Sequence, residues 1–91
     1  MSFKSKETEK IWLGIVSLKF SKEIQNIARR KLRMINNSIN LLDLKIPPSN
    51  NLELLKGDRK GQYSIRINDK WRICFKWINN NSYDLEIVDY H

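Results

Sequence analysis

The chain ends in Asp89-Tyr90-His91, three side chains that can move protons or contact a base. His91 is the only histidine, and histidine is the side chain that most readily changes charge near neutral pH. Two arginines, Arg66 and Arg72, occur in the segments just before, and a guanidinium suits phosphate because it offers two parallel donors. These groups have the chemistry needed to cleave RNA. One removes the proton of the ribose 2′-OH, the arginines stabilise charge at phosphorus, and another protonates the 5′-oxygen.

Three segments in the C-terminal half alternate apolar and polar residues, which is typical of β-strands. They are "QYSIRIN", "WRICFKW" and "YDLEIVDYH". Short connections make such neighbouring strands antiparallel. A three-residue loop at 68–70 pairs Ile65 with Ile73 and keeps the apolar faces matched. The same register sets Arg66 directly opposite Arg72.

The register of the last strand follows from the same matching of apolar faces. It pairs Trp77 with Tyr83, and it sets Arg72 against Val88. One face of the sheet, including Tyr83, is then core, while the other collects Arg66, Arg72 and the chain end. Like charges directly opposite one another destabilise a sheet. The arginine pair therefore indicates either a bound anion or screening by water and carboxylates, and a merely solvated outer face stays open as the alternative.

The N-terminal half is predicted to be helical. Ser21 is a suitable N-cap, and the apolar residues after it recur at helical spacing on one face: Ile24, Ile27, Ala28, Leu32 and Ile35. A shorter helix is expected over 6–13, ended by Gly14, and a strand at 2–4 is also considered. Helices followed by antiparallel strands predict one α+β domain over residues 1–91, with Asp89 on the core side of the last strand or splayed to its rim.

The chain is strongly basic, with 17 Lys and Arg against 10 Asp and Glu and a net charge of +7. On a small domain this favours a polyanionic partner, nucleic acid first. A solubilising surface and an acidic protein partner are the alternatives. Basic residues of the helical half are expected to contact RNA or else to form a solvated face; they are Lys19, Lys22, Arg29, Arg30, Lys31 and Arg33.

Several other classes of protein are disfavoured. The single cysteine, Cys74, permits no internal disulfide, fits a reducing cytoplasm, and is expected to be a small packed residue. One histidine among scattered carboxylates is poor evidence for a metal site. The sequence contains no glycine-rich loop of the kind that binds phosphate groups. No apolar run approaches the length of a membrane span, and the polar first ten residues do not resemble a signal peptide.

The second half of the chain resembles a known family. The stretch "IPPSNNLELLKGDRKGQYSIRINDKWRICFKW", followed by "EIVDYH", is similar to the HigB family of type II toxins, the killer proteins of plasmid-maintenance modules. These belong to the RelE/ParE superfamily. The segment "ARRKLRMI" agrees as well, and the similarity covers 46–91 most clearly.

The resemblance implies a compact fold with N-terminal helices on a small, mostly antiparallel sheet. It implies a ribosome-dependent endoribonuclease that cuts mRNA in the ribosomal A site without metal. A HigA-like helix-turn-helix antitoxin would neutralise it, and operator DNA would be bound only through that complex. By position, catalysis falls on the terminal segment 89–91 with Arg72, and RNA or phosphate contacts fall on Arg66, Lys56, Arg59 and Lys60.

The chain departs from the family pattern at two positions. Glu53 stands where some members have a histidine that contributes to the site, although others also have glutamate there. Asn51 stands where arginine is usual, which removes one basic contact. Which group is the general base and which the general acid therefore stays open. So do two further functions: a toxin of this fold that acts by binding its target, and a weak toxin that serves mainly as co-repressor with its antitoxin.

Overall fold

Both predicted helices form, and both begin at serine caps. The computed structural model describes residues 1–89, so Tyr90 and His91 lie outside the described residues. The Ser5 hydroxyl accepts a hydrogen bond from the Thr8 N–H, and the Ser21 hydroxyl accepts one from the Ile24 N–H. Each bond satisfies a donor that a helix N-terminus leaves without a partner. The helices and strands are α1 (Lys6–Trp12), α2 (Lys22–Asn37), β1 (Glu53–Leu54), β2 (Tyr63–Arg66), β3 (Trp71–Ile78) and β4 (Asn81–Asp89), with 3₁₀ turns at Leu41–Lys45, Pro48–Asn50 and Gly57–Arg59.

The strands form one antiparallel sheet in the order β1-β2-β3-β4. The two-residue strand β1 was not predicted. It pairs Glu53 with Ser64 at the edge of the sheet. The predicted register between β2 and β3 is confirmed, with Ile65 opposite Ile73 and Arg66 opposite Arg72.

The register between β3 and β4 is predicted correctly at one end and wrongly at the other. Arg72 lies opposite Val88 as expected, but Trp77 pairs with Ser82 rather than with Tyr83. The turn holds two residues, 79 and 80, whose φ values of 50° and 62° fit a type I′ hairpin turn. That tight turn shifts the pairing by one residue. A β-bulge restores it: between the pairs Cys74–Glu86 and Lys76–Tyr83, β4 holds two residues where β3 holds one.

The bulge changes which β4 side chains reach the core. Asp84 lies in the bulged stretch with φ 53°, a left-handed conformation. Side chains on either side of it no longer follow one alternating pattern, so Ser82 and Leu85 are both buried. Tyr83 is 37% exposed, and its predicted place in the core is wrong.

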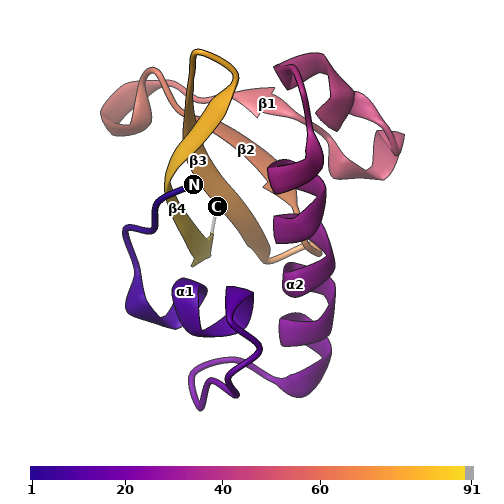
Figure 1. The fold of residues 1–91 in the computed structure, drawn as a ribbon, viewed down its shortest axis with the longest axis vertical. Helices are drawn as coiled ribbons and strands as arrows, with labels where there is room; N and C mark the ends of the chain where they lie inside the picture. Colours follow the sequence, from indigo (N-terminus) through magenta and orange to yellow (C-terminus); the bar gives the residue numbers. More distant parts are fainter. Residues whose placement is uncertain (90–91) are drawn as a thin grey trace.

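The helices cover one face of the sheet (Figure 1). Apolar side chains from α1 and α2 pack there against alternate residues of β2, β3 and β4. The predicted α+β architecture is therefore confirmed. The buried cluster comprises Ile11, Phe20, Ala28, Leu32, Ile35, Leu44, Ile65, Ile67, Ile73, Phe75, Leu85 and Ile87.

The N-terminal segment lies along β4. Phe3 makes an isolated parallel bridge with Leu85. The Lys4 N–H donates to the Leu85 carbonyl at 3.0 Å, and the Leu85 N–H donates to the Ser2 carbonyl at 3.0 Å. The strand considered at 2–4 is therefore present as a single bridge. Across residues 1–89, no helix has the length and apolar character to cross a membrane.

Candidate active site

The face of the sheet turned away from the helices carries the predicted arginine pair. Arg66 on β2 and Arg72 on β3 are register partners, and Arg72 is also the partner of Val88 on β4. The register thus places Arg72 beside the end of β4, which leads into the predicted catalytic Tyr90 and His91, and it places Arg66 one strand further away. Those two side chains lie outside the described residues.

Arg72 is buried, with 8% of its surface exposed. Its Nε donates to Ser64 Oγ at 2.8 Å, and its Nη2 donates to the Asn51 carbonyl at 2.6 Å. The Glu53 carboxylate lies 4.0 Å from Nη2. The alternative of a merely solvated outer face is therefore wrong at this position, because Ser64 and the Asn51 carbonyl accept hydrogen bonds from the buried guanidinium. Within residues 1–89, Nη1 makes no hydrogen bond.

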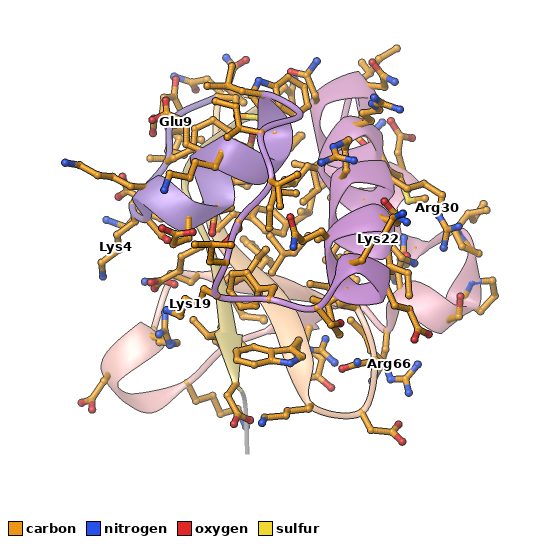
Figure 2. All side chains as sticks on the ribbon, turned by 90° about the horizontal axis from the view of Figure 1, so that it is seen from below. Lys4, Glu9, Lys19, Lys22, Arg30 and Arg66 are labelled. Carbon is orange, nitrogen blue, oxygen red and sulfur yellow. The ribbon has the colours of Figure 1, made fainter. Side chains whose placement is uncertain are left out.

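Arg66 is more accessible, with 37% of its side chain exposed, and it pairs with Asp69 in the hairpin loop. Figure 2 shows it on the sheet layer, with Lys22 and Arg30 on α2 above. The two arginines therefore differ. The environment of Arg72 is fixed by buried hydrogen bonds, whereas Arg66 is held by an exposed carboxylate that a bound phosphate can replace at little cost.

Asp89 lies at the rim of the sheet rather than in the core. It is the register partner of Trp71, its side chain is 40% exposed, and its Oδ2 lies 3.9 Å from Lys70 Nζ. The Lys70 ammonium also lies 5.1 Å from the centre of the Trp71 ring. Of the two positions considered for Asp89, the structure gives the one at the rim, on the strand next to Arg72.

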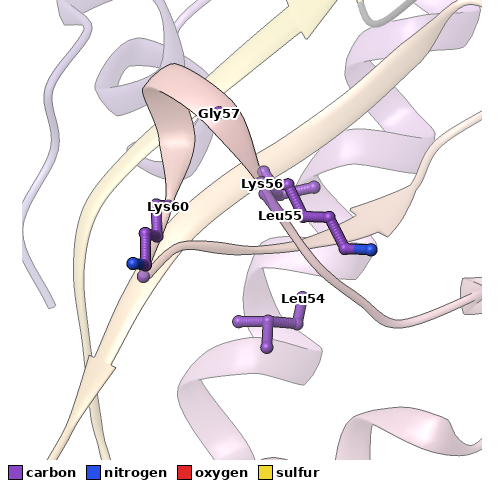
Figure 3. Close-up of a pocket in the computed structure, with 6 residues that line it drawn as sticks. Leu54, Leu55, Lys56, Gly57 and Lys60 are labelled. Carbon is purple, nitrogen blue, oxygen red and sulfur yellow. The ribbon is translucent and has the colours of Figure 1, made fainter.

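The basic loop contributes its cations to two different places. Arg59 donates to Glu86 on β4 at 2.6 Å and to Gln62 at 3.3 Å. Lys56 and Lys60 instead line an open groove of about 480 Å³ (Figure 3). Neither Arg66 nor Arg72 lines that groove, whose other walls are Leu54, Leu55, Gly57 and Gly61. The three predicted RNA-contacting residues of the loop therefore do not form one cavity with the arginine pair.

Cys74 is fully buried beside this site. Burial raises the pKa of its thiol, with smaller effects from the charges of Arg59, Glu86 and Arg72. A thiol in such surroundings is a poor nucleophile, which fits the expected packing role. Within residues 1–89, no three His, Cys, Asp or Glu side chains gather as metal ligands would.

Sequence reasoning missed Lys31 and Asn50. Lys31 was grouped with the exposed cations of α2, but it is only 6% exposed and its ammonium donates to Asn50 Oδ1. Burial lowers the pKa of Lys31, and the nearby charges of Arg30 and Arg66 lower it further. A signal was present in the sequence, because Lys31 continues the apolar helix stripe at three residues after Ala28 and four before Ile35.

The comparisons with known proteins agree with this architecture. A family model described as "RelE-like toxin of type II toxin-antitoxin system HigB" matches residues 2–91. The chain is 41% identical over 56 residues to Toxin HigB-1 of Vibrio cholerae, and 50% identical over 40 residues to Endoribonuclease HigB of Proteus vulgaris. These alignments cover 62% and 44% of this chain and 59% and 44% of the relatives, so the chain spans less than two thirds of their length.

A solved structure shares the fold. The YoeB–YefM complex from Staphylococcus aureus contains a chain that superposes with a TM-score of 0.63 at 20% identity, covering 100% of this chain and 95% of that one. At this identity the likeness concerns the fold alone. The family model matches nearly all residues and therefore identifies the family as well as the fold. The chain therefore belongs to the HigB-like family of RelE-like toxins of type II toxin–antitoxin systems.

Proposed function

We propose that this protein is a ribosome-dependent endoribonuclease that cleaves mRNA in the ribosomal A site and so inhibits translation in the cytoplasm. One observation carries the proposal. A strand register in a chain of the HigB-like family sets Arg66 opposite Arg72, beside the strand that leads into Asp89-Tyr90-His91. A relative from Proteus vulgaris that matches part of the chain is named an endoribonuclease, which supports the same class of reaction.

In this proposal the arginines handle charge and the chain end handles protons. Arg66 binds the phosphate, and Arg72 stabilises the negative charge that develops at phosphorus. Asp89 and His91 are the candidates for proton transfer, and Tyr90 positions or stacks on a base. In this proposal the 2′-OH of the RNA is the nucleophile, and side chains supply the acid, the base and the charge stabilisation, so the reaction proceeds without a metal ion.

The remaining basic residues are proposed to guide RNA. Lys56, Arg59 and Lys60 lie on the loop that leads into β2, where phosphates of the mRNA or of ribosomal RNA can be neutralised. A net charge of +7 favours this kind of contact and makes its affinity fall with salt.

The proposed partner in regulation is a cognate antitoxin, a HigA-like helix-turn-helix protein. The Staphylococcus aureus structure that shares the fold is a toxin–antitoxin complex, which supports an antitoxin partner for this chain too. Operator DNA would be bound through that complex and not by the toxin alone.

The test is to map the 5′ ends of mRNA after induction. Wild-type protein is expected to give cuts at a fixed codon phase. His91→Ala and Arg66→Gln should remove the cuts while still binding the antitoxin, whereas Lys6→Gln, a change at an exposed cation of α1, should leave them. Cuts that persist unchanged in His91→Ala would show that the terminal histidine has no part in the reaction.

One observation favours two alternative functions. Because Arg72 already donates to Asn51 and Ser64, and Glu53 lies 4.0 Å from it, its capacity for substrate is reduced. A weak toxin that serves mainly as co-repressor, or one that acts by binding its target, would show no phased cuts. The weak toxin predicts no growth arrest together with a tight antitoxin complex, and the binder predicts growth arrest without cleavage.

A further inference from the structure

Lys31 is a buried cation that the proposed reaction does not use. It lies in the middle of α2 and is 6% exposed. Within residues 1–89, no carboxylate lies within ion-pair distance of its ammonium, and its hydrogen bond goes to the neutral side chain of Asn50. A buried charge is costly unless it is paired. A methionine at this position would fill similar space without that cost, so packing alone does not explain the lysine.

The hydrogen bonds of Lys31 lead to the arginine pair. Asn50 is fully buried, and its Nδ2 donates to the Leu44 carbonyl at 3.1 Å and the Ile46 carbonyl at 3.4 Å. Lys31 occupies the Oδ1 of the same amide. Both ends of the Asn50 side chain are therefore fixed, which also fixes the backbone at the start of the next residue.

That next residue is the one that holds Arg72. Asn51 adopts a left-handed conformation with φ 45°, and its carbonyl accepts the 2.6 Å hydrogen bond from Arg72 Nη2. A non-glycine residue keeps such a conformation when its surroundings enforce it. The clamped Asn50 supplies that constraint from one side, and Arg72 supplies it from the other.

The charges near Lys31 also link it to the arginine pair. The positive charge of Arg66 is close enough to Lys31 to disfavour its protonated form. Lys31 and Arg66 therefore repel each other, while Lys31 and Arg72 both donate hydrogen bonds to the segment at 50–51. A phosphate arriving at Arg66 would relieve this mutual repulsion, so the charge of Lys31 favours the bound anion at a distance.

We propose that Lys31 is a positioning residue for the phosphate-binding arginines, acting through the clamped Asn50 and the Asn51 carbonyl on the guanidinium of Arg72. The inference rests on the proposed endoribonuclease function. It predicts that removing Lys31 misaligns Arg72 without breaking contact between the toxin and the ribosome. Misplacement of a catalytic group by about 1 Å can lower a rate about 100-fold.

The test compares Lys31→Met with Lys6→Met, the same substitution at an exposed lysine outside the site, using full-length protein and ribosomes programmed with mRNA. Lys31→Met is expected to lower the cleavage rate at saturating ribosomes by about 10- to 100-fold. The ribosome concentration for half-maximal rate should stay within about twofold, because the substituted side chain is buried. Lys6→Met should match the wild type in both quantities.

A second measurement reads the arrangement directly. In nuclear magnetic resonance spectra, the Nε–H signal of Arg72 reports its hydrogen bond to Ser64. Lys31→Met should shift this signal and speed its exchange with solvent, and Lys6→Met should not. Lys31→Gln, which keeps a polar but uncharged group, serves as a second variant if the methionine variant does not fold.

The outcomes separate the inference from the proposed function. No cleavage by the wild type would contradict the endoribonuclease itself. Cleavage by Lys31→Met at the wild-type rate, or an unmoved Arg72 signal, would overturn the inference alone. If neither Lys31 variant folds while Lys6→Met does, Lys31 serves the fold and the positioning role is overturned as well.

Discussion

The two faces of the sheet bury side chains by different kinds of contact. On the helix side, apolar side chains such as Ile65, Ile73 and Phe75 join one continuous cluster. On the other side, Leu55 and Cys74 are buried outside that cluster, and Arg72 and Ser64 are buried polar residues. There Arg72 bonds to Ser64 and to the Asn51 carbonyl.

The helix side mainly stabilises the fold, whereas the other side mainly orients the guanidinium of Arg72. Apolar contacts have no preferred direction, so the helix side can stabilise the fold while many arrangements of its atoms remain acceptable. Hydrogen bonds to a guanidinium prescribe where each nitrogen lies. The side turned away from the helices therefore buries little apolar area but fixes the orientation of Arg72. A phosphate site requires such a fixed orientation.

The largest expected effect comes from emptying the helix-side core. Phe75 is fully buried between Tyr63 and Trp77, and Phe75→Ala should lower the free energy of unfolding by about 3–5 kcal/mol. Urea denaturation followed by tryptophan fluorescence measures the loss. Ile78→Ala on the same strand, at a residue 53% exposed, should change it by less than about 0.5 kcal/mol. Equal losses would show that the core is not concentrated on this face.

A smaller loss of stability is expected on the polar side. Arg72→Lys removes the donors that reach Ser64 and the Asn51 carbonyl, so the free energy of unfolding should fall by about 1–3 kcal/mol. The charge stays, and so the loss reports directed hydrogen bonds rather than net charge. Denaturation of this variant beside Lys6→Arg, an exposed exchange in the opposite direction, measures it. An unchanged stability would mean that the guanidinium is not held.

Thiol chemistry tests whether the polar side is closed. Burial raises the pKa of the Cys74 thiol above its ordinary value, so at pH 8 the reactive thiolate is scarcer than in an unfolded chain. A thiol reagent should therefore label folded protein only as fast as it opens, and should label protein in urea at once. Rapid labelling of the folded protein would contradict a closed face. The helix-side variant Phe75→Ala should speed labelling through global opening.

The smallest effect concerns a polar contact beside α1. The Glu7 carboxylate accepts hydrogen bonds from Ser17 and Lys10, which lower its pKa below the ordinary value of 4.5. Such a group contributes stability above pH 4.5 and loses it as the pH falls through the folded value. Glu7→Gln should therefore be less stable than wild type at pH 7, with the difference shrinking in acid. Urea midpoints from pH 7 to pH 3 measure this, and a difference that is constant with pH would refute it.

Much of the helix-side face was predictable from the sequence, and the reason is periodicity. The alternation in β2 and β3 fixed their register down to the opposed Arg66 and Arg72, because a slip of one residue exposes every apolar side chain. The end of β3 was not predictable in this way. There the turn at 79–80 decided the pairing, and its conformation is set by two asparagines with positive φ rather than by hydrophobicity.

The polar side was harder to predict because its contacts come from segments without periodicity. Strand β1 has two residues, and the acceptor for Arg72 is a backbone carbonyl, which no side-chain pattern reveals. Lys31 was predicted to lie on the exposed face of the helix, because a lysine on a helix is usually solvated. The spacing of Lys31 from Ala28 and Ile35 carried the opposite information, and the buried position follows that spacing.

The bridge between Phe3 and Leu85 has a consequence for solubility. The edge of a sheet offers unpaired backbone groups to other chains and can seed aggregation. Here the first residues occupy the N–H and the carbonyl of Leu85, and the bulge at Asp84 bends the strand just beside them. Removing the first four residues would therefore expose unpaired backbone groups on the edge strand β4. The shortened protein would precipitate in a concentration-dependent way even where the remaining core stays intact.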